Sequence, residues 1–183
     1  MNQAMGMLEL TAITRGLMAT DAMVKAAPVR ILASQTICAG KYMVLVAGDV
    51  ADVKAALQAG RETAGTALLD ELTLPNPHEG IFPALAGTVE SGDPEAVGVV
   101  ETFTVAASVT AADRAAKSGD VLLKEIRIAN GLGGKSFVVF LGDVASVQEG
   151  LRAAEAELEG KGLIVETCII TGPHPEFTES ALP

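Results

Sequence analysis

The chain has 183 residues, of which 49% are hydrophobic and only 3% are aromatic, and its formal net charge is −10. This charge and the lack of a Lys/Arg cluster argue against a nucleic-acid-binding surface, because phosphate backbones bind basic faces. The mean hydropathy is +0.38, yet no apolar run is long enough to span a bilayer, so we expect hydrophobic surface to be buried in an oligomer and not in a membrane. The chain starts without a basic segment followed by an apolar segment and a cleavage site, so we expect a cytoplasmic location.

The sequence repeats itself. Residues 5–25 recur as residues 97–117 at a constant offset of 92 (97 − 5), and the offset rises to 94 and then to 96 further along the chain. The last value is reached where Pro77-His78 recurs as Pro173-His174 (173 − 77). The second copy has therefore gained two residues at two places. We predict two tandem domains over 1–87 and 96–183, joined by a linker over 88–95.

In chain order, the first copy predicts a strand over 4–13, a helix over 17–27, strands over 29–37 and 42–47, a helix over 50–66 and a strand over 71–74. The second copy predicts the same order, with a strand over 96–105, a helix that contains Asp113 and Lys117, strands over 121–129 and 137–141, a helix over 144–159 and a strand over 163–170. The tail from residue 174 carries turn residues and little core. The order β-α-β-β-α-β is the split βαβ arrangement, so the predicted fold class is α/β (α+β), with two tandem ferredoxin-like domains whose helices cover one face of each sheet.

Acidic residues occupy equivalent positions in the two copies. Asp49 and Asp143 each follow the glycine that ends a strand, so each is placed to accept N–H groups of the first turn of the next helix. Glu9 and Glu101 are equivalent by the repeat but need not meet in space, so no two-carboxylate acid/base site is predicted. No nucleophile with an adjacent base is evident either. We therefore expect a protein that is not an enzyme.

Each copy also carries an acidic and a basic residue four positions apart in its first helix. Asp21 and Lys25 form this pair in the first copy, and Asp113 and Lys117 repeat it. Such spacing favours an ion pair on a helix surface. We expect both pairs to lie on solvated faces.

A loop ending in glycine and lysine separates the second and third strands of each copy, at residues 36–41 and 130–135. The second loop contains Gly134-Lys135-Ser136, but a strand follows where a phosphate-binding loop needs a helix, so we predict a tight loop in which glycine lets backbones crowd together. Cys38 in the first loop is either a small apolar residue or a metal ligand. Cys168 lies at a non-equivalent position in an alternating strand, where we expect it to pack in the core and to form no disulfide.

The strings G-M-L-E-L, D-A-M-V-K-A-A and V-A-G-D-V-A-D-V-K-A-A, followed by a P-x-P-H turn, resemble the bacterial microcompartment (BMC) shell domain. The resemblance covers about 4–80 and 96–176, with both copies in the unpermuted order. It implies a tandem-domain shell subunit that assembles as a homotrimer, in which three chains imitate the hexagonal tile of six single-domain chains. It also implies a location in the microcompartment shell, with other BMC shell proteins and encapsulated redox enzymes as partners.

Within that group, the loop over 36–41 is similar to the pore loop of a tandem-domain shell protein of propanediol-utilisation compartments, although Ala39 stands where the family pattern has Pro. The resemblance implies that Cys38 is a metal ligand and that three chains bind one [4Fe–4S] cluster on the threefold axis. Ala39 and Gly40 would lie beside this cofactor, their N–H groups stabilising its sulfurs. Three thiolates leave one iron open to another ligand, whereas structural zinc usually needs four protein ligands. The implied pore loops are Thr36, Ile37, Cys38, Ala39 and Gly40, and Asn130, Gly131, Leu132, Gly133 and Gly134.

The resemblance also implies a tile edge. Single-domain tiles usually carry an Arg before the Pro-His turn, and neither copy has it, so lateral packing must depend more on the lysines. His78 and His174 lack partner ligands at metal spacing and are expected to make local hydrogen bonds or to lie at the edge. The implied edge residues are Lys25, Lys117, Asn76, His78 and His174.

Two other functions stay open on the sequence alone. One is a cluster-free shell tile that acts as a metabolite pore, with Cys38 merely lining the axis. The other is a soluble small-molecule-binding regulator, which a duplicated ferredoxin-like fold permits.

Overall fold

The computed structural model describes residues 4–90 and 92–181. The first copy forms β1 (Ala4–Leu10), α1 (Ile13–Ala26), β2 (Arg30–Ile37), β3 (Lys41–Gly48), α2 (Val50–Ala64), a 3-10 turn (Gly65–Ala67), β4 (Leu68–Leu74) and α3 (Ile81–Ala86). The second copy forms β5 (Ala96–Thr102), α4 (Val105–Ser118), β6 (Leu122–Arg127), β7 (Ser136–Gly142), α5 (Val144–Leu158), β8 (Ile164–Thr171) and α6 (Pro175–Ala181). The predicted order β-α-β-β-α-β is confirmed in both copies. Among the described residues, no helix is long and apolar enough to span a bilayer.

The chain folds as two compact units whose limits differ from those of the sequence copies. Unit 1 consists of the residues up to Pro77 together with Ala129–Gly134, and unit 2 consists of His78–Ile128 together with the residues from Lys135 onward. Unit 1 therefore includes a loop from the second copy, and unit 2 includes α3, which continues the first copy.

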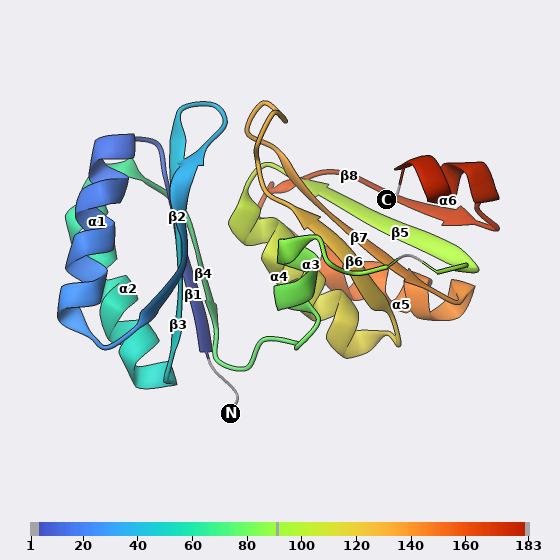
Figure 1. Cartoon of the computed structure of the whole chain (residues 1–183), viewed down its shortest axis with the longest axis horizontal. Helices are drawn as coiled ribbons and strands as arrows, with labels where there is room; N and C mark the ends of the chain where they lie inside the picture. Colours follow the sequence, from blue (N-terminus) through green and yellow to red (C-terminus); the bar gives the residue numbers. More distant parts are fainter. Residues whose placement is uncertain (1–3, 91, 182–183) are drawn as a thin grey trace. The chain divides into compact units, whose positions relative to one another are not determined.

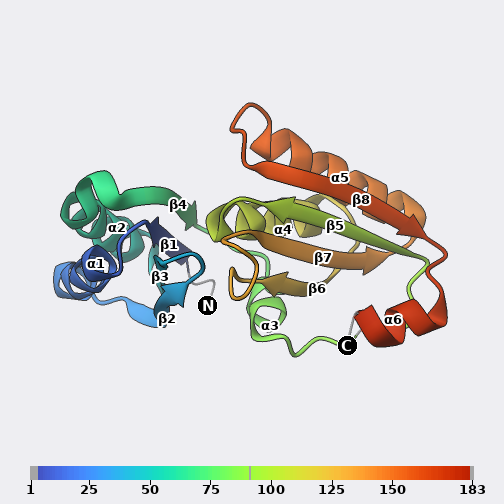
Figure 2. The ribbon, with the colours of Figure 1, turned by 90° about the horizontal axis from the view of Figure 1, so that it is seen from above.

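Each unit is built on a four-stranded antiparallel sheet. The strand order is β2-β3-β1-β4 in unit 1 and β6-β7-β5-β8 in unit 2, so the last strand of each copy pairs with its first. Helices α1 and α2 cover one face of the first sheet (Figure 1), and α4 and α5 cover one face of the second (Figure 2). These features agree with the ferredoxin-like prediction.

The strand registers locate the first of the two insertions. Gln35 pairs with Met43 in the first copy and Arg127 with Phe137 in the second. The offset is 92 on the near side of this hairpin (127 − 35) and 94 on the far side (137 − 43). The two extra residues therefore lie in the loop between β6 and β7.

The second insertion lies between the second helix and the last strand. Ala64 and Leu158 end α2 and α5 at an offset of 94 (158 − 64), whereas Leu68 and Ile164 begin β4 and β8 at an offset of 96 (164 − 68). The five residues 159–163 replace the three-residue 3-10 turn of the first copy. Neither insertion disturbs a sheet.

The core between helices and sheet is made mainly of aliphatic side chains. In unit 1, β1 is buried along its whole length and packs with residues of α1, β3 and α2 such as Met23, Val46 and Leu57. In unit 2, Phe140 is fully buried, and a Cβ added at Gly98 would lie 2.3 Å from its ring. Only glycine leaves room for this close approach of the ring to the neighbouring strand.

Several predicted boundaries were wrong. The predicted strand over 4–13 ends at Leu10, and Ile13 begins α1, because the aliphatic and Thr residues here resemble a strand while their tertiary setting is helical. The tail was expected to have little core, yet it forms α6, whose Phe177 packs against the second sheet. Pro175 begins this helix, at a position where the missing N–H has no cost.

The predicted aspartate caps are confirmed in one copy only. Asp143 accepts the backbone N–H of Ser146 at 2.9 Å and its hydroxyl at 2.6 Å. These bonds hold the pKa of Asp143 below its ordinary value, and the bond from the Ser146 hydroxyl has a larger effect than the bond from its backbone N–H. Asp49 precedes α2 at the equivalent place, but its side chain makes no capping bond.

Candidate functional site

The first candidate residue, Cys38, lies at the tip of the β2-β3 hairpin. β2 ends at Ile37 and β3 begins at Lys41, so Cys38, Ala39 and Gly40 form the turn. Gly40 has a φ of 76°, and a Cβ added there would meet nothing within 4 Å. Its role is therefore to adopt a left-handed backbone conformation that other residues disfavour. The Cys38 side chain is half-buried.

The loop Ala129–Gly134, also part of unit 1, holds the cysteine turn through two hydrogen bonds. The backbone N–H of Cys38 donates to the carbonyl oxygen of Ala129 at 2.8 Å, and the N–H of Gly131 donates to Sγ of Cys38 at 3.1 Å. Three glycines of this loop, Gly131, Gly133 and Gly134, have positive φ angles. The glycine-rich sequence is thus explained by backbone geometry. From the sequence, Ala39 and Gly40 were expected as N–H donors to cluster sulfurs. The Gly131 N–H, which contacts the cysteine sulfur itself, was not expected, because a backbone donor leaves no side-chain signal.

A buried ion pair supports the same turn. Nζ of Lys41 donates to Oε1 of Glu9 at 2.5 Å and to the carbonyl oxygen of Gly134 at 3.0 Å. The Glu9 side chain is fully buried, and that of Lys41 is 13% exposed. One lysine therefore links the central strand β1 to the loop that contacts Cys38. This coupling was not predicted.

The donors in one chain define what the site can bind. Within residues 4–90 and 92–181, no three His, Cys, Asp or Glu side chains are grouped so as to hold a metal ion. Each chain contributes one thiol at the β2-β3 turn. A metal centre that uses Cys38 would therefore need further ligands from other chains.

Cys168 does not pack in the core, contrary to the prediction. It lies exposed on β8, opposite Val99, whereas its equivalent Leu72 is buried opposite Met7. The alternating pattern of the strand identified two faces but not which of them is covered. Partial burial, together with the negative charge of Glu166, raises the pKa of the Cys168 thiol.

The predicted helix ion pairs both form, but in different settings. Lys25 contacts Asp21 at 2.5 Å on an exposed face, as expected. Lys117 contacts Asp113 at 2.7 Å, but the Asp113 side chain is only 2% exposed, so the expectation of a solvated pair was wrong there. The reason is that Asp113 also accepts the backbone N–H of His78 at 2.8 Å.

The remaining edge candidates lie in the turns after the last strands. Asn76 is exposed two residues after β4. Nδ1 of His78 accepts the N–H of Gly80, and Nδ1 of His174 accepts the N–H of Glu176, each at 3.2 Å. Both imidazoles thus make local hydrogen bonds that shape the turn.

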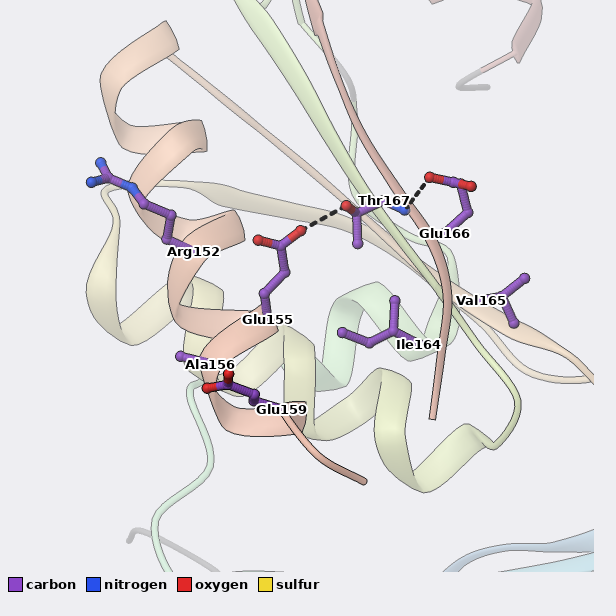
Figure 3. Close-up of a pocket in the computed structure, with 8 residues that line it drawn as sticks. All are labelled: Arg152, Glu155, Ala156, Glu159, Ile164, Val165, Glu166 and Thr167. Carbon is purple, nitrogen blue, oxygen red and sulfur yellow. Dashed lines mark hydrogen bonds between the residues drawn. The ribbon is translucent and has the colours of Figure 1, made fainter. Parts of the chain in front are cut away.

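An open cleft of about 520 Å³ lies between α5 and β8 (Figure 3). Across it, Glu155 accepts the hydroxyl of Thr167 at 2.7 Å. The equivalent residues of the first copy, Arg61 (155 − 94) and Glu71 (167 − 96), form an ion pair at 2.8 Å. The two copies therefore join the second helix to the last strand by different contacts. The cleft is lined by Arg152, Glu155, Ala156, Glu159, Ile164, Val165, Glu166 and Thr167.

Comparison with known proteins adds independent findings. The BMC domain family matches residues 4–77 and 96–173. The bacterial microcompartment shell protein PduT of Citrobacter freundii is 44% identical over 174 residues, which cover 95% of each chain. The carboxysome shell protein CsoS1C of Hydrogenovibrio crunogenus is 36% identical over 86 residues, covering 45% of this chain and 84% of that protein. The crystal structure of a microcompartment protein from Desulfitobacterium hafniense has 41% sequence identity and a TM-score of 0.87, covering 98% of this chain and 99% of that one.

Proposed function

This chain belongs to the BMC-domain family of bacterial microcompartment shell proteins, and from this premise we propose that three copies form a pseudohexameric shell tile with an iron–sulfur cluster on its threefold axis. The predicted structural role, with no enzymatic activity, is confirmed by the shell proteins to which the chain is similar. Its place is in the microcompartment shell, among other shell proteins. The regulator considered from the sequence alone loses its support, because the similarity to PduT extends over almost the whole chain.

The trimer follows from the duplicated fold. Two similar domains per chain fill six similar positions only when three chains close a ring. The registers support this reading, because Ala4 pairs with Gly48 just as Ala96 pairs with Gly142. The two domains thus offer nearly the same backbone to their neighbours. Three chains bring three Cys38 residues to the axis.

The observation that carries the cluster proposal is the position of the Cys38 thiol. It lies half-buried at a hairpin tip, and its sulfur accepts the Gly131 N–H. A donor aimed at sulfur disperses the negative charge of a thiolate and favours metal ligation. Lys41 fixes the loop by bonding the carbonyl oxygen of Gly134. Three such thiolates are the protein ligands of a [4Fe–4S] cluster with one open iron, and such a cluster supplies one-electron transfer.

Different residues of the chain have distinct roles around this centre. Cys38 binds iron, and Gly131 orients and stabilises its sulfur. The pair Glu9 and Lys41 holds the β2-β3 turn against the Ala129–Gly134 loop. A cluster held in this way would pass electrons between the two sides of the shell, with encapsulated redox enzymes as partners. Lys25, Lys117, Asn76, His78 and His174 stay proposed edge residues for contact with other tiles.

A matched pair of cysteine variants tests the proposal. Wild type, Cys38→Ser and Cys168→Ser are purified and reconstituted anaerobically, and bound iron, visible absorption and native mass are measured. We expect about four irons per trimer in wild type and Cys168→Ser. Cys38→Ser should lose the iron and the absorption and keep the trimer mass.

Each alternative has its own outcome. Equal iron in wild type and Cys38→Ser would overturn the cluster and leave a tile with a metabolite pore. A monomer or a dimer at micromolar concentration would overturn the trimer itself.

A further inference from the structure

The starting point is a contact within unit 2. The backbone N–H of His78 donates to Oδ1 of Asp113 at 2.8 Å, while Nζ of Lys117 donates to Oδ2 at 2.7 Å. The carboxylate is therefore held between a lysine of its own helix α4 and the backbone of an incoming turn. With the Asp113 side chain only 2% exposed, this contact is a desolvated, charge-assisted hydrogen bond.

Both halves of this contact occur a second time in the chain. The repeat relates His78 to His174 (174 − 78 = 96) and Asp113 to Asp21 (113 − 21 = 92). The two turns have the same conformation. The carbonyl oxygen of His78 accepts an N–H three residues later at 3.1 Å, that of His174 does so at 2.9 Å, and each Nδ1 accepts the N–H two residues later at 3.2 Å. The turn at His174 is thus shaped for the same partner.

The His174 N–H and the Asp21 carboxylate are both accessible to a partner. The Asp21 side chain is 61% exposed and pairs with Lys25, as Asp113 pairs with Lys117. His174 is exposed, and within the described part of the chain its backbone N–H has no acceptor. An N–H in this position and an exposed carboxylate are complementary.

Exposed apolar side chains on α1 and β2 also indicate a docking surface on the first copy. On α1, Leu17 is 55% exposed, whereas its equivalent on α4, Val109, is fully buried. On β2, Ile31 is 40% exposed, whereas its equivalent Leu123 is 2% exposed. The first copy thus exposes apolar side chains at positions that the second copy buries, which marks a surface that another protein covers.

Leu123 also shows what kind of segment gives this cover. A Cβ added at Gly80, two residues after His78, would lie 3.6 Å from Cδ1 of Leu123, and α3 packs against β6. The segment that begins at His78 therefore covers both Asp113 and Leu123. The equivalent turn, which begins at His174, is the matching cover for Asp21 and Ile31, while α6 beyond it packs on the second sheet of its own chain through Phe177.

We infer that the Pro173-His174 turn of one chain docks on α1 and β2 of a second copy, with the His174 N–H donating to the Asp21 carboxylate of that copy. The inference rests on the proposed trimer, since six similar positions around a ring have six similar junctions. Three of these are the contact between His78 and Asp113 inside each chain. The other three lie between chains.

Matched variants on α1 test the contact. Asp21→Ala removes the acceptor and the ion pair, whereas Lys25→Ala removes only the ion pair and leaves the carboxylate. We expect Asp21→Ala to raise the monomer concentration at which the trimer dissociates by roughly tenfold or more for each junction, because the lost bond is charge-assisted. Lys25→Ala should leave the dissociation curve, measured by sedimentation or native mass spectrometry, at the wild-type position.

Cross-linking tests the same geometry directly. In a Cys38→Ser/Cys168→Ser background, the pair Asp21→Cys with His174→Cys is treated with a short bismaleimide, and the pair Asp113→Cys with His78→Cys serves as control. The first pair should give dimers and trimers on a denaturing gel, and the control should give only internally linked monomer. A wild-type trimer with no intermolecular product from the first pair, or with an unchanged Asp21→Ala curve, would overturn this inference and leave the trimer standing. A wild-type chain that is not a trimer would instead refute the proposed function.

Discussion

The two copies place the same ion pair at different depths. Glu9 and Lys41 join β1 to β3 in a nearly dry setting, with exposed fractions of 0% and 13%. Glu101 of β5 and Lys135, the residue before β7, form the equivalent pair, with exposed fractions of 30% and 43%. The repeat thus fixes which residues meet, but the surroundings decide how much the contact contributes. The buried pair also bonds the loop that contacts Cys38, through Lys41 and the carbonyl oxygen of Gly134.

The β2-β3 turn and the β6-β7 loop, which are equivalent in the repeat, also differ between the copies. The first copy turns within three residues and presents a thiol, whereas the second uses a longer loop from which the Gly131 N–H contacts that thiol. The two-residue insertion lies at this place. Duplication has therefore allowed one hairpin to present a thiol and the other to contact it, which six identical domains cannot do.

The largest expected difference between the copies concerns these ion pairs. Lys41→Met removes the cation that Glu9 contacts in a buried site, so we expect the β1-β3 pairing to lose about 3 kcal/mol of opening free energy. Lys135→Met removes an exposed partner of Glu101 and should cost under about 1 kcal/mol. Native-state hydrogen exchange separates the two effects, because the strands give distinct peptides.

Equal losses in the two sheets would show that depth does not control the strength of the pair. A loss confined to Lys135→Met would reverse the comparison.

The sequence predicted the fold well because a repeat carries information on topology. The offsets of 92, 94 and 96 implied the same element order in both copies, and every insertion falls in a loop. The contact of Gly131 with Cys38 could not be predicted, since it joins residues 93 apart (131 − 38) through a backbone donor. The burial of Asp113 was missed for a similar reason, because its acceptor role depends on a backbone N–H in another segment.

The two edge lysines give the next comparison. Lys117→Glu places a negative charge beside the buried carboxylate of Asp113, and we expect it to destabilise unit 2 by about 2 kcal/mol. Lys25→Glu places the same charge beside the exposed Asp21 and should cost about 0.5 kcal/mol. Thermal unfolding of each variant measures the difference.

The exposed position also gives a cleaner test of the tile edge. Lys25→Glu should keep the fold while abolishing sheets in electron micrographs, whereas loss of sheets in Lys117→Glu would be mixed with loss of stability. Wild-type sheets formed by Lys25→Glu would refute the edge role of this lysine.

The smallest expected difference concerns the caps of α2 and α5. Asp143 accepts two hydrogen bonds from Ser146, whereas the equivalent partner of Asp49 is Asp52 (146 − 94), which has no hydroxyl to donate and carries a like charge. Asp143→Ala should therefore speed amide exchange in the first turn of α5 at pH 7, and Asp49→Ala should change α2 little. The reciprocal change, Asp52→Ser, should supply the missing donor and slow exchange in the first turn of α2.

The pH dependence of this cap has a definite sign. The pKa of Asp143 is lowered by its bonds to Ser146, so the stabilisation of α5 is complete above the ordinary aspartate pKa of about 3.9 and is lost as the pH falls through the lower, folded value. The effect of Asp143→Ala on α5 should consequently be large at pH 7 and small at about pH 2. Asp52→Ser should create the same pH dependence in α2, where wild type has no side-chain cap. If Asp52→Ser leaves α2 unchanged at both pH values, the difference between the caps comes from the helix backbone and not from the residue three positions on.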